Sequence, residues 1–211
     1  MADTGPRSPL TSLGPTEPAL GHFFGTGIRG GVEWYVRAFG PAAAQTAVMR
    51  LPPPHRQQLD PHDPALGILG ARKYSYAFVG EVMRAMAATV RKDEDLFLRD
   101  IVAHGVDATL NTVGRAFLRY VVSPQLIVSR AQEMWNVFHD SGRISIVSMA
   151  DSEYVAQIND WPNHDTTVCK MCGEARRRII ERTGLRVEVR RERCQAWGHD
   201  SCTYRVKWRK P

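Results

Sequence analysis

The stretch HDTTVCKMCGEARRRIIERTGLRVEVRRERCQAWGHDSCTYRVKWR, residues 164–209, decides the fold of this chain. Up to Thr183 its apolar residues recur at helical spacing, and Gly184 is a strong C-terminal stop for a helix. Two segments of alternating apolar and polar residues follow, LRVEVRRERC and SCTYRVKWR, which is typical of strands with one buried face. The order predicts a helix that packs its apolar side on a sheet.

Working outward toward the N-terminus, RISIVSM (143–149) and SEYVAQI (152–158) also alternate and predict two further strands. Before them the pattern is helical, apart from the first 21 residues and the Pro-rich connection from Leu51 to Gly67. Together the segments predict an α+β fold, an N-terminal helical block packed on a C-terminal antiparallel sheet with one crossover helix. The expected helices before the sheet cover residues 28–39, 76–90, 94–122 and 124–139.

The expected domain organisation is a flexible tail, residues 1–21, followed by one domain over residues 22–211. The tail is rich in Pro, Gly, Ser and Thr, whereas the whole chain has 43% hydrophobic and 24% charged residues, which is ordinary for a globular protein. No apolar run approaches the ~20 residues of a membrane helix. We therefore expect no membrane insertion and a cytoplasmic location.

All four cysteines lie in the C-terminal third. Cytosolic thiols stay reduced, so metal ligation or free thiols are expected before disulfides. Cys169 and Cys172 share one face of the predicted helix, and Cys194 and Cys202 flank a hairpin turn. Four converging thiolates would form a structural zinc site, although the second pair is spaced more widely than in zinc fingers. The alternatives are small core residues and a redox pair.

Strand parity sets a condition on this site. Cys202 has the same parity as Val206, whereas Cys194 has the opposite parity from Val189. Without a bulge the two sulfurs would therefore point to different faces of the sheet. A single bulge before Cys194 would bring them to the same side.

The segment CQAWGHDSCTYRVKW, Cys194 to Trp208, resembles the C-terminal signature of the 4-vinyl reductase domain, a relative of TRAPP trafficking subunits and heme-NO-binding-associated folds. The layout from about Gly27 to Trp208 is also similar to a paralogous family of uncharacterised myxobacterial proteins of similar length. The resemblance implies a sensory or adaptor domain, frequently a homodimer, that binds a small apolar ligand and relays its presence to a protein effector. It does not imply reductase activity.

In aromatic-sensing activators that carry this domain, an upstream cysteine, a glutamate and two downstream cysteines hold zinc beneath a small-molecule pocket. Cys194 and Cys202 match the downstream pair, and Cys169 falls near the upstream ligand. The glutamate position is Arg191 here, so Cys172 would supply the missing ligand, with Glu192 a poorer substitute. The resulting expectation is zinc on Cys169, Cys172, Cys194 and Cys202.

A pocket between helices and sheet would be lined by aromatic side chains, for which plain core packing is the alternative. The leading hypothesis is thus a non-enzymatic small-molecule-sensing or adaptor domain with a structural zinc site. The candidate pocket residues are Tyr120, Trp135, Phe138, Tyr154 and Trp161.

The alternative hypothesis is a zinc-stabilised nucleic-acid-binding module. From Lys170 to Pro211 there are thirteen Lys and Arg against five Asp and Glu, and several could grip phosphates. No nucleic-acid motif accompanies them, and a basic face is usually a solvated surface. The predicted basic face consists of Arg186, Arg190, Arg205, Lys207 and Arg209.

Other motifs favour neither an enzyme nor a heme protein. There is no nucleophile elbow, phosphate-binding loop or metalloprotease helix. His104 lies in a helical pattern among apolar neighbours, so we interpret it as a core residue and do not expect heme. The GTGIRG motif, residues 25–30, follows no predicted strand, and we interpret its glycines as chain flexibility.

Overall fold

The computed structural model describes residues 21–112 and 123–211. Helices dominate the first part and an antiparallel sheet the second, so the predicted α+β class is confirmed. The first part comprises β1 (His22–Phe24), α1 (Thr26–Met49), α2 (Pro53–Arg56), β2 (Lys73–Ser75), α3 (Tyr76–Thr89) and α4 (Glu94–Thr112). The second comprises α6 (Pro124–Ser129), α7 (Ala131–Phe138), β3 (Arg143–Ala150), β4 (Glu153–Asn159), α8 (Thr166–Glu181), β5 (Arg186–Arg193), a short 3-10 turn (Gln195–Trp197) and β6 (Cys202–Arg209).

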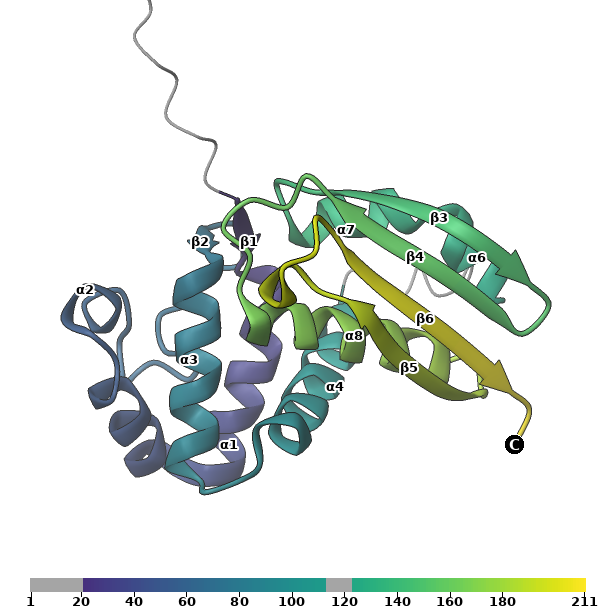
Figure 1. Cartoon of the computed structure of the whole chain (residues 1–211). Helices are drawn as coiled ribbons and strands as arrows, with labels where there is room; N and C mark the ends of the chain where they lie inside the picture. The colour runs from purple at the N-terminus through teal and green to yellow at the C-terminus, as the bar shows by residue number, and fades with distance from the viewer. Residues whose placement is uncertain (1–20, 113–122) are drawn as a thin grey trace, which may run out of the picture.

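The main sheet has the strand order β3-β4-β6-β5, and all of its strand pairs are antiparallel. Helices α6, α7 and α8 lie on the same face of this sheet, behind it in Figure 1. Tyr154 and Val206 are buried beneath these helices, whereas Lys207 is exposed. This alternation is the one that the sequence predicts.

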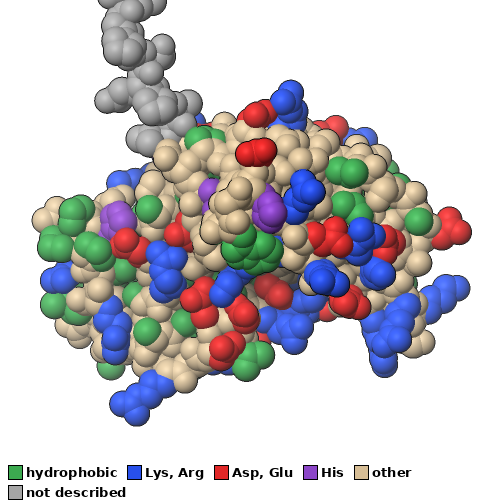
Figure 2. Space-filling view, in the orientation of Figure 1, with side chains coloured by type: hydrophobic (Ala, Val, Ile, Leu, Met, Phe, Trp, Pro, Cys, Tyr) green, Lys and Arg blue, Asp and Glu red, His purple; other side chains and the backbone are tan. Residues whose placement is uncertain are grey.

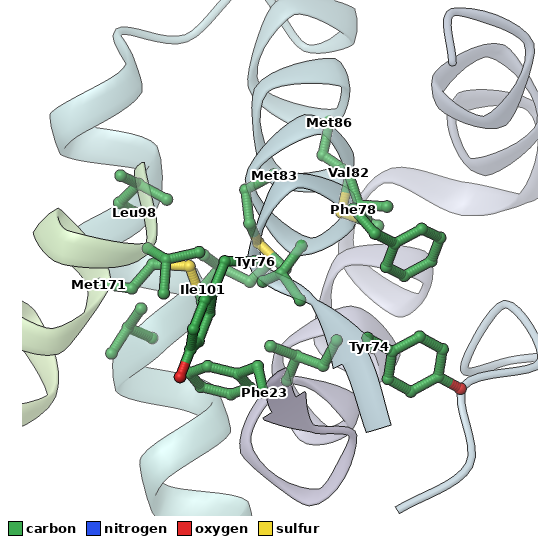
Figure 3. Packing of buried hydrophobic residues seen from close by; sticks show 14 of the residues in the cluster. Phe23, Tyr74, Tyr76, Phe78, Val82, Met83, Met86, Leu98, Ile101 and Met171 are labelled. Atoms are coloured by element: carbon green, nitrogen blue, oxygen red, sulfur yellow. The ribbon is translucent and has the colours of Figure 1, made fainter. Parts of the chain in front are cut away.

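Helix α8 is the central element, because it lies between the sheet and the helical block of α1, α3 and α4 (Figure 1). Figure 3 shows the packing inside this block, where Met83 of α3, Ile101 of α4 and Met171 of α8 converge. All three side chains are at most 5% exposed. The crossover helix therefore buries one side on the sheet and the other on the helical block.

The glycines of the GTGIRG motif and its neighbour Gly31 are packing positions, which corrects their interpretation as flexible. Gly25, just before α1, faces the Leu69 carbonyl, and Gly27 faces the Phe23 ring. Gly30 and Gly31 lie where α1 meets α4. A Cβ on Gly31 would come 2.7 Å from the carbonyl oxygen of Ile101, and one on Gly30 would come 2.6 Å from the Cβ of Ala108. The absence of side chains lets α1 and α4 approach closely.

The single helix predicted over residues 124–139 is two helices, α6 and α7. Ser123 caps α6 as its position indicates, with its hydroxyl accepting from the Leu126 N–H at 3.3 Å. At Arg130 the backbone leaves helical geometry, with φ −113° and ψ 18°. The break lets α6 bury Ile127 over the sheet while α7 turns Trp135 toward His139.

Among the residues that the structure describes, no helix combines the length and apolar character that crossing a membrane requires.

Candidate metal centre and ligand pocket

One imidazole and three thiols converge at the start of α8. The donor atoms of His164, Cys169, Cys194 and Cys202 all lie within 4.8 Å of one another. The Cys169 sulfur is 3.6 Å from that of Cys202 and 3.8 Å from that of Cys194, whose sulfur is 3.6 Å from His164 Nε2. A tetrahedral zinc ion with ~2.3 Å bonds to sulfur separates its ligands by ~3.8 Å. We call these four residues the cysteine-histidine cluster.

Local structure explains how the four donors meet. Asp165 caps α8 by accepting from the Thr167 and Val168 N–H groups at 2.8 and 3.1 Å. His164 therefore lies just before the first turn of the helix, and Cys169 lies just after it. Cys194 and Cys202 close the β5–β6 hairpin opposite that turn. The cluster therefore joins the beginning of the crossover helix to the end of the hairpin.

The bulge that strand parity requires is present. Arg191 pairs with Tyr204 and Arg193 pairs with Thr203, so one extra residue, Glu192, sits in β5. Beyond this irregularity Cys194 lies on the same side of the sheet as Cys202. Both cysteines are fully buried.

The structure brings together three of the four predicted zinc ligands and separates the fourth. Cys172 lies one turn further along α8, and its sulfur is 3.7 Å from His139 Nε2 instead. His164 is not among the ligands that the sequence pattern predicts. Its place immediately before a helix cap, five residues from Cys169, is a signal that could have identified it.

Arg191, which stands where the 4-vinyl reductase signature has a glutamate, supplies a charge and no metal ligand. Its guanidinium lies 4.5 Å from the ring centroid of Trp197 and beside Cys169. Hydrogen bonds with Cys202, His164, Tyr204 and Arg191, opposed by burial, lower the pKa of Cys169. This shift favours one thiolate in the cluster.

The other two thiols of the cluster resist ionisation. The hydrogen bond to Cys169, together with burial, raises the pKa of Cys202, and burial next to the Cys169 charge raises that of Cys194. A second negative charge would face the first at under 4 Å. A bound divalent cation removes this conflict and deprotonates coordinating thiols.

A small apolar cavity lies on the other side of the same helix, between α6, α7, the inner face of the sheet and α8. Its volume is about 90 Å³. A second hollow of about 60 Å³ shares Phe138, His139, Cys172, Ala175 and Ile179 with it. We call the larger one the α7–α8 cavity.

A buried histidine separates the two hollows. The His139 ring stacks on Trp135 at 3.5 Å between centroids, and its Nδ1 is 3.1 Å from the Tyr76 hydroxyl. Burial, with the charge of Arg176 nearby, lowers the pKa of His139 well below its ordinary value. Burial also raises the pKa of Cys172 to about 12, so this pair is a neutral thiol beside a neutral imidazole.

The predicted pocket residues have three outcomes. Trp135, Phe138 and Tyr154 line the α7–α8 cavity. Trp161 is buried behind it, with its ring edge-on to Trp135 at 5.1 Å. Tyr120 lies outside the described residues.

The predicted basic residues share the open face of the sheet, but acidic side chains are interspersed with them. Arg205 pairs with Glu153 and Glu192, and Lys207 pairs with Glu153 at 3.1 Å. Figure 2 shows the resulting mixture of positive and negative side chains on this side of the molecule. Arg186, Arg190 and Arg209 complete the set, with Arg186 opposite Arg209 and Arg190 opposite Arg205.

His104 is exposed, not a core residue as its sequence context indicated. Its ring stacks on Trp34 at 4.5 Å between centroids, on the outer side of α1 and α4. His139, in contrast, is buried and hydrogen-bonded.

Comparison with known proteins identifies the fold as that of H-NOX domains. The Fe(II) unliganded H-NOX protein from K. algicida has a TM-score of 0.63 and 8% identity over 89% of this chain and 97% of that one. An H-NOX triple mutant from S. oneidensis, in the Fe(II) ligation state, gives 0.66 and 9% over 89% and 96%. An oxygen-binding H-NOX domain related to soluble guanylate cyclases gives 0.60 and 10% over 89% and 95%.

No model of a protein family matches this chain, and no curated protein matches it. The comparisons thus show a fold shared with H-NOX domains, and support neither the 4-vinyl reductase domain nor the myxobacterial family. At this identity the likeness establishes the fold alone.

The expectation that this chain does not bind heme is corrected by these comparisons, because the similar structures are H-NOX domains. Another structure with this fold, at a TM-score of 0.54 and 10% identity, concerns heme redox potential and porphyrin distortion. In the present chain the α7–α8 cavity is smaller than the ~300 Å³ at which pockets for drug-sized ligands begin. A porphyrin would therefore enter only if α6 and α7 moved away from α8.

Proposed function

We propose that this chain is a non-enzymatic small-molecule-sensing domain in which zinc, held by the cysteine-histidine cluster, fixes the crossover helix beneath a ligand cavity. It would act through a protein effector. The observation that carries the proposal is the convergence of one imidazole and three thiols within 4.8 Å. A Cys₃His donor set is a common structural zinc site.

The arrangement of α8 supports a link between the metal and the ligand. Cys169 contributes to the cluster, and Cys172, one turn later, lines the cavity together with Ala175 and Ile179. Zinc would hold the first turn of α8 on the β5–β6 hairpin. A ligand in the cavity would then contact a helix that is anchored at its N-terminal end. A shift of the C-terminal end of α8 would transmit ligand binding to the effector.

The first experiment measures the metal content of the purified, untagged protein by plasma mass spectrometry. We expect about one zinc per chain, and its loss in Cys169→Ser, Cys202→Ser and His164→Ala. Cys172→Ser is the matched control, because it is also a buried cysteine of α8 but lies outside the cluster. It should retain zinc.

Two results would contradict the proposal. One is wild-type protein without zinc after purification in zinc-containing medium. The other is zinc that is lost in Cys172→Ser and kept in His164→Ala. The same preparations are scanned for a porphyrin absorption band, because heme is found with this fold; heme binding would replace the proposed ligand class.

A further inference from the structure

Two polar side chains converge on the otherwise apolar α7–α8 cavity, Arg176 from α8 and Tyr154 from β4. Pockets of this kind use a few placed polar groups to orient a ligand, while the apolar wall supplies most of the affinity. The partners of these two groups therefore indicate what the cavity binds.

Arg176 has no acidic partner within the described residues, unlike its neighbours on the same helix. Arg177 pairs with Glu174 and Glu181, and Arg178 pairs with Asp107. Its described hydrogen bonds go to Cys172, from Nη1 to the carbonyl oxygen at 2.7 Å and to the side chain. A guanidinium has five N–H donors, so these two bonds leave donors for a further partner.

Aromatic rings offset part of the cost of placing this cation in an apolar wall. The guanidinium carbon lies 4.6 Å from the ring centroid of Tyr204 and 6.0 Å from that of Trp135. Such cation–π contacts are attractive because the face of an aromatic ring is electronegative. They leave the planar edge of the guanidinium, which recognises carboxylates, without an anion.

Tyr154 adds a second donor at the same place. The residue is 4% exposed and lines the same cavity as Arg176. Burial raises the pKa of Tyr154, so the hydroxyl keeps its proton and can donate it. The only other ionisable nitrogen in the wall belongs to His139, which is neutral, so the cavity presents a single positive charge.

We propose that the α7–α8 cavity binds a small apolar monocarboxylate, with its carboxylate on Arg176 and Tyr154 and its hydrocarbon part against Ile127, Met134 and Ile179. This assignment rests on the proposed function and names its ligand class. A cavity of about 90 Å³ is smaller than the ~150 Å³ cavity that holds benzene, which limits the ligand to about four or five carbon atoms.

Thermal unfolding and calorimetric titration test the assignment in a carboxylate-free buffer. The probes are butyrate and valerate, with butyramide and 1-butanol as uncharged counterparts. In the wild type we expect the acids to bind at least about tenfold more tightly than the amide or alcohol, because a hydrogen-bonded charge pair contributes ~1.5–3 kcal/mol. Binding raises the unfolding temperature in proportion.

Variants of the cavity separate the two donors. Arg176→Met should abolish the preference for the acids, and Tyr154→Phe should weaken acid binding by about tenfold while leaving the shape of the cavity unchanged. The matched control is Arg178→Met, which removes the same charge from the same helix outside the cavity. It should bind the acids as the wild type does.

Three outcomes decide between the inferences. Acid-selective binding that depends on Arg176 supports the assignment. Equal binding of the acids and the uncharged probes, unchanged in Arg176→Met, would overturn the carboxylate assignment and leave the sensing function intact. No binding of any probe by zinc-loaded wild type would overturn both.

Discussion

Arg84 of α3 and Asp165, the N-cap of α8, form an ion pair at 3.1 Å, and the same Arg84 Nη1 donates to the Thr167 hydroxyl at 2.8 Å. The guanidinium therefore holds the first turn of the crossover helix against the helical block. Gly80 permits this approach, because a Cβ there would lie 2.3 Å from Asp165 Oδ1. Two of the four donors of the cluster, His164 and Cys169, flank this turn.

We expect Asp165→Ala to lower the free energy of unfolding by about 1–2 kcal/mol, as the loss of a helix cap does. It should also weaken zinc binding by about tenfold, since groups that orient metal ligands typically have effects of this size. Urea unfolding and competition with a chromogenic chelator measure the two effects. Glu133→Ala, which removes an exposed ion pair with Arg130, is the control and should change neither.

The close contact of α1 and α4 predicts a steric effect. Gly31→Ala should destabilise the protein by about 1–3 kcal/mol, because its Cβ would meet the Ile101 carbonyl oxygen, which cannot move without displacing α4. Gly70→Ala is the matched control, since its nearest neighbours are 3.9 Å away. Equal urea midpoints for the two variants would refute the packing role of Gly31.

The buried His139 predicts a pH dependence of stability. Its pKa in the folded protein is lowered, so as the pH falls the unfolded chain takes up the proton first. Its contribution to the free energy of unfolding is therefore complete above about pH 6.5 and is lost below it, by at most about 1.4 kcal/mol per pH unit.

Urea unfolding from about pH 7 to about pH 5 measures this slope. His139→Phe should have a shallower slope than the wild type, and His62→Gln, at an exposed histidine, should keep the wild-type slope. The acid sensitivity of the cysteines is common to all three proteins, so the difference between slopes reports His139. Identical slopes for the wild type and His139→Phe would contradict the assignment.

Metal removal should act locally before it unfolds the chain. With a chelator, we expect faster amide hydrogen exchange at residues 164–172 and 193–203, the two segments that the cluster joins. The β3–β4 hairpin, whose ladder does not depend on the cluster, serves as the internal reference. A uniform increase over both regions would argue against a local role for the metal.

The strands and the crossover helix were predictable because their signals are local. The alternation of apolar and polar residues in β4, β5 and β6 predicts which side chains are buried, and Gly184 marks the end of the helical run. The need for a bulge before Cys194 also followed from parity alone. The structure adds its position, at Glu192.

What could not be predicted depends on contacts between distant segments. The spacing of His164 from Cys169 marks it as a candidate ligand, but the contact that completes the cluster forms only because the β5–β6 hairpin reaches the start of α8. Gly31 and Gly30 of α1 depend on Ile101 and Ala108, which are 70 and 78 residues further along the chain. The break at Arg130 has no glycine or proline to mark it and follows from the different partners of α6 and α7.

The bulge in β5 reverses which residues face the helices. Up to Arg191 the odd-numbered side chains face them, whereas after the bulge the even-numbered Cys194 does. Deletion of Glu192 would restore regular alternation along the strand. The Cys194 sulfur would then point to the open face of the sheet, although no donor residue had been replaced. Chains of this fold that keep both hairpin cysteines but lack the extra residue between them and the strand would therefore have lost the metal centre, although a motif search would still report it.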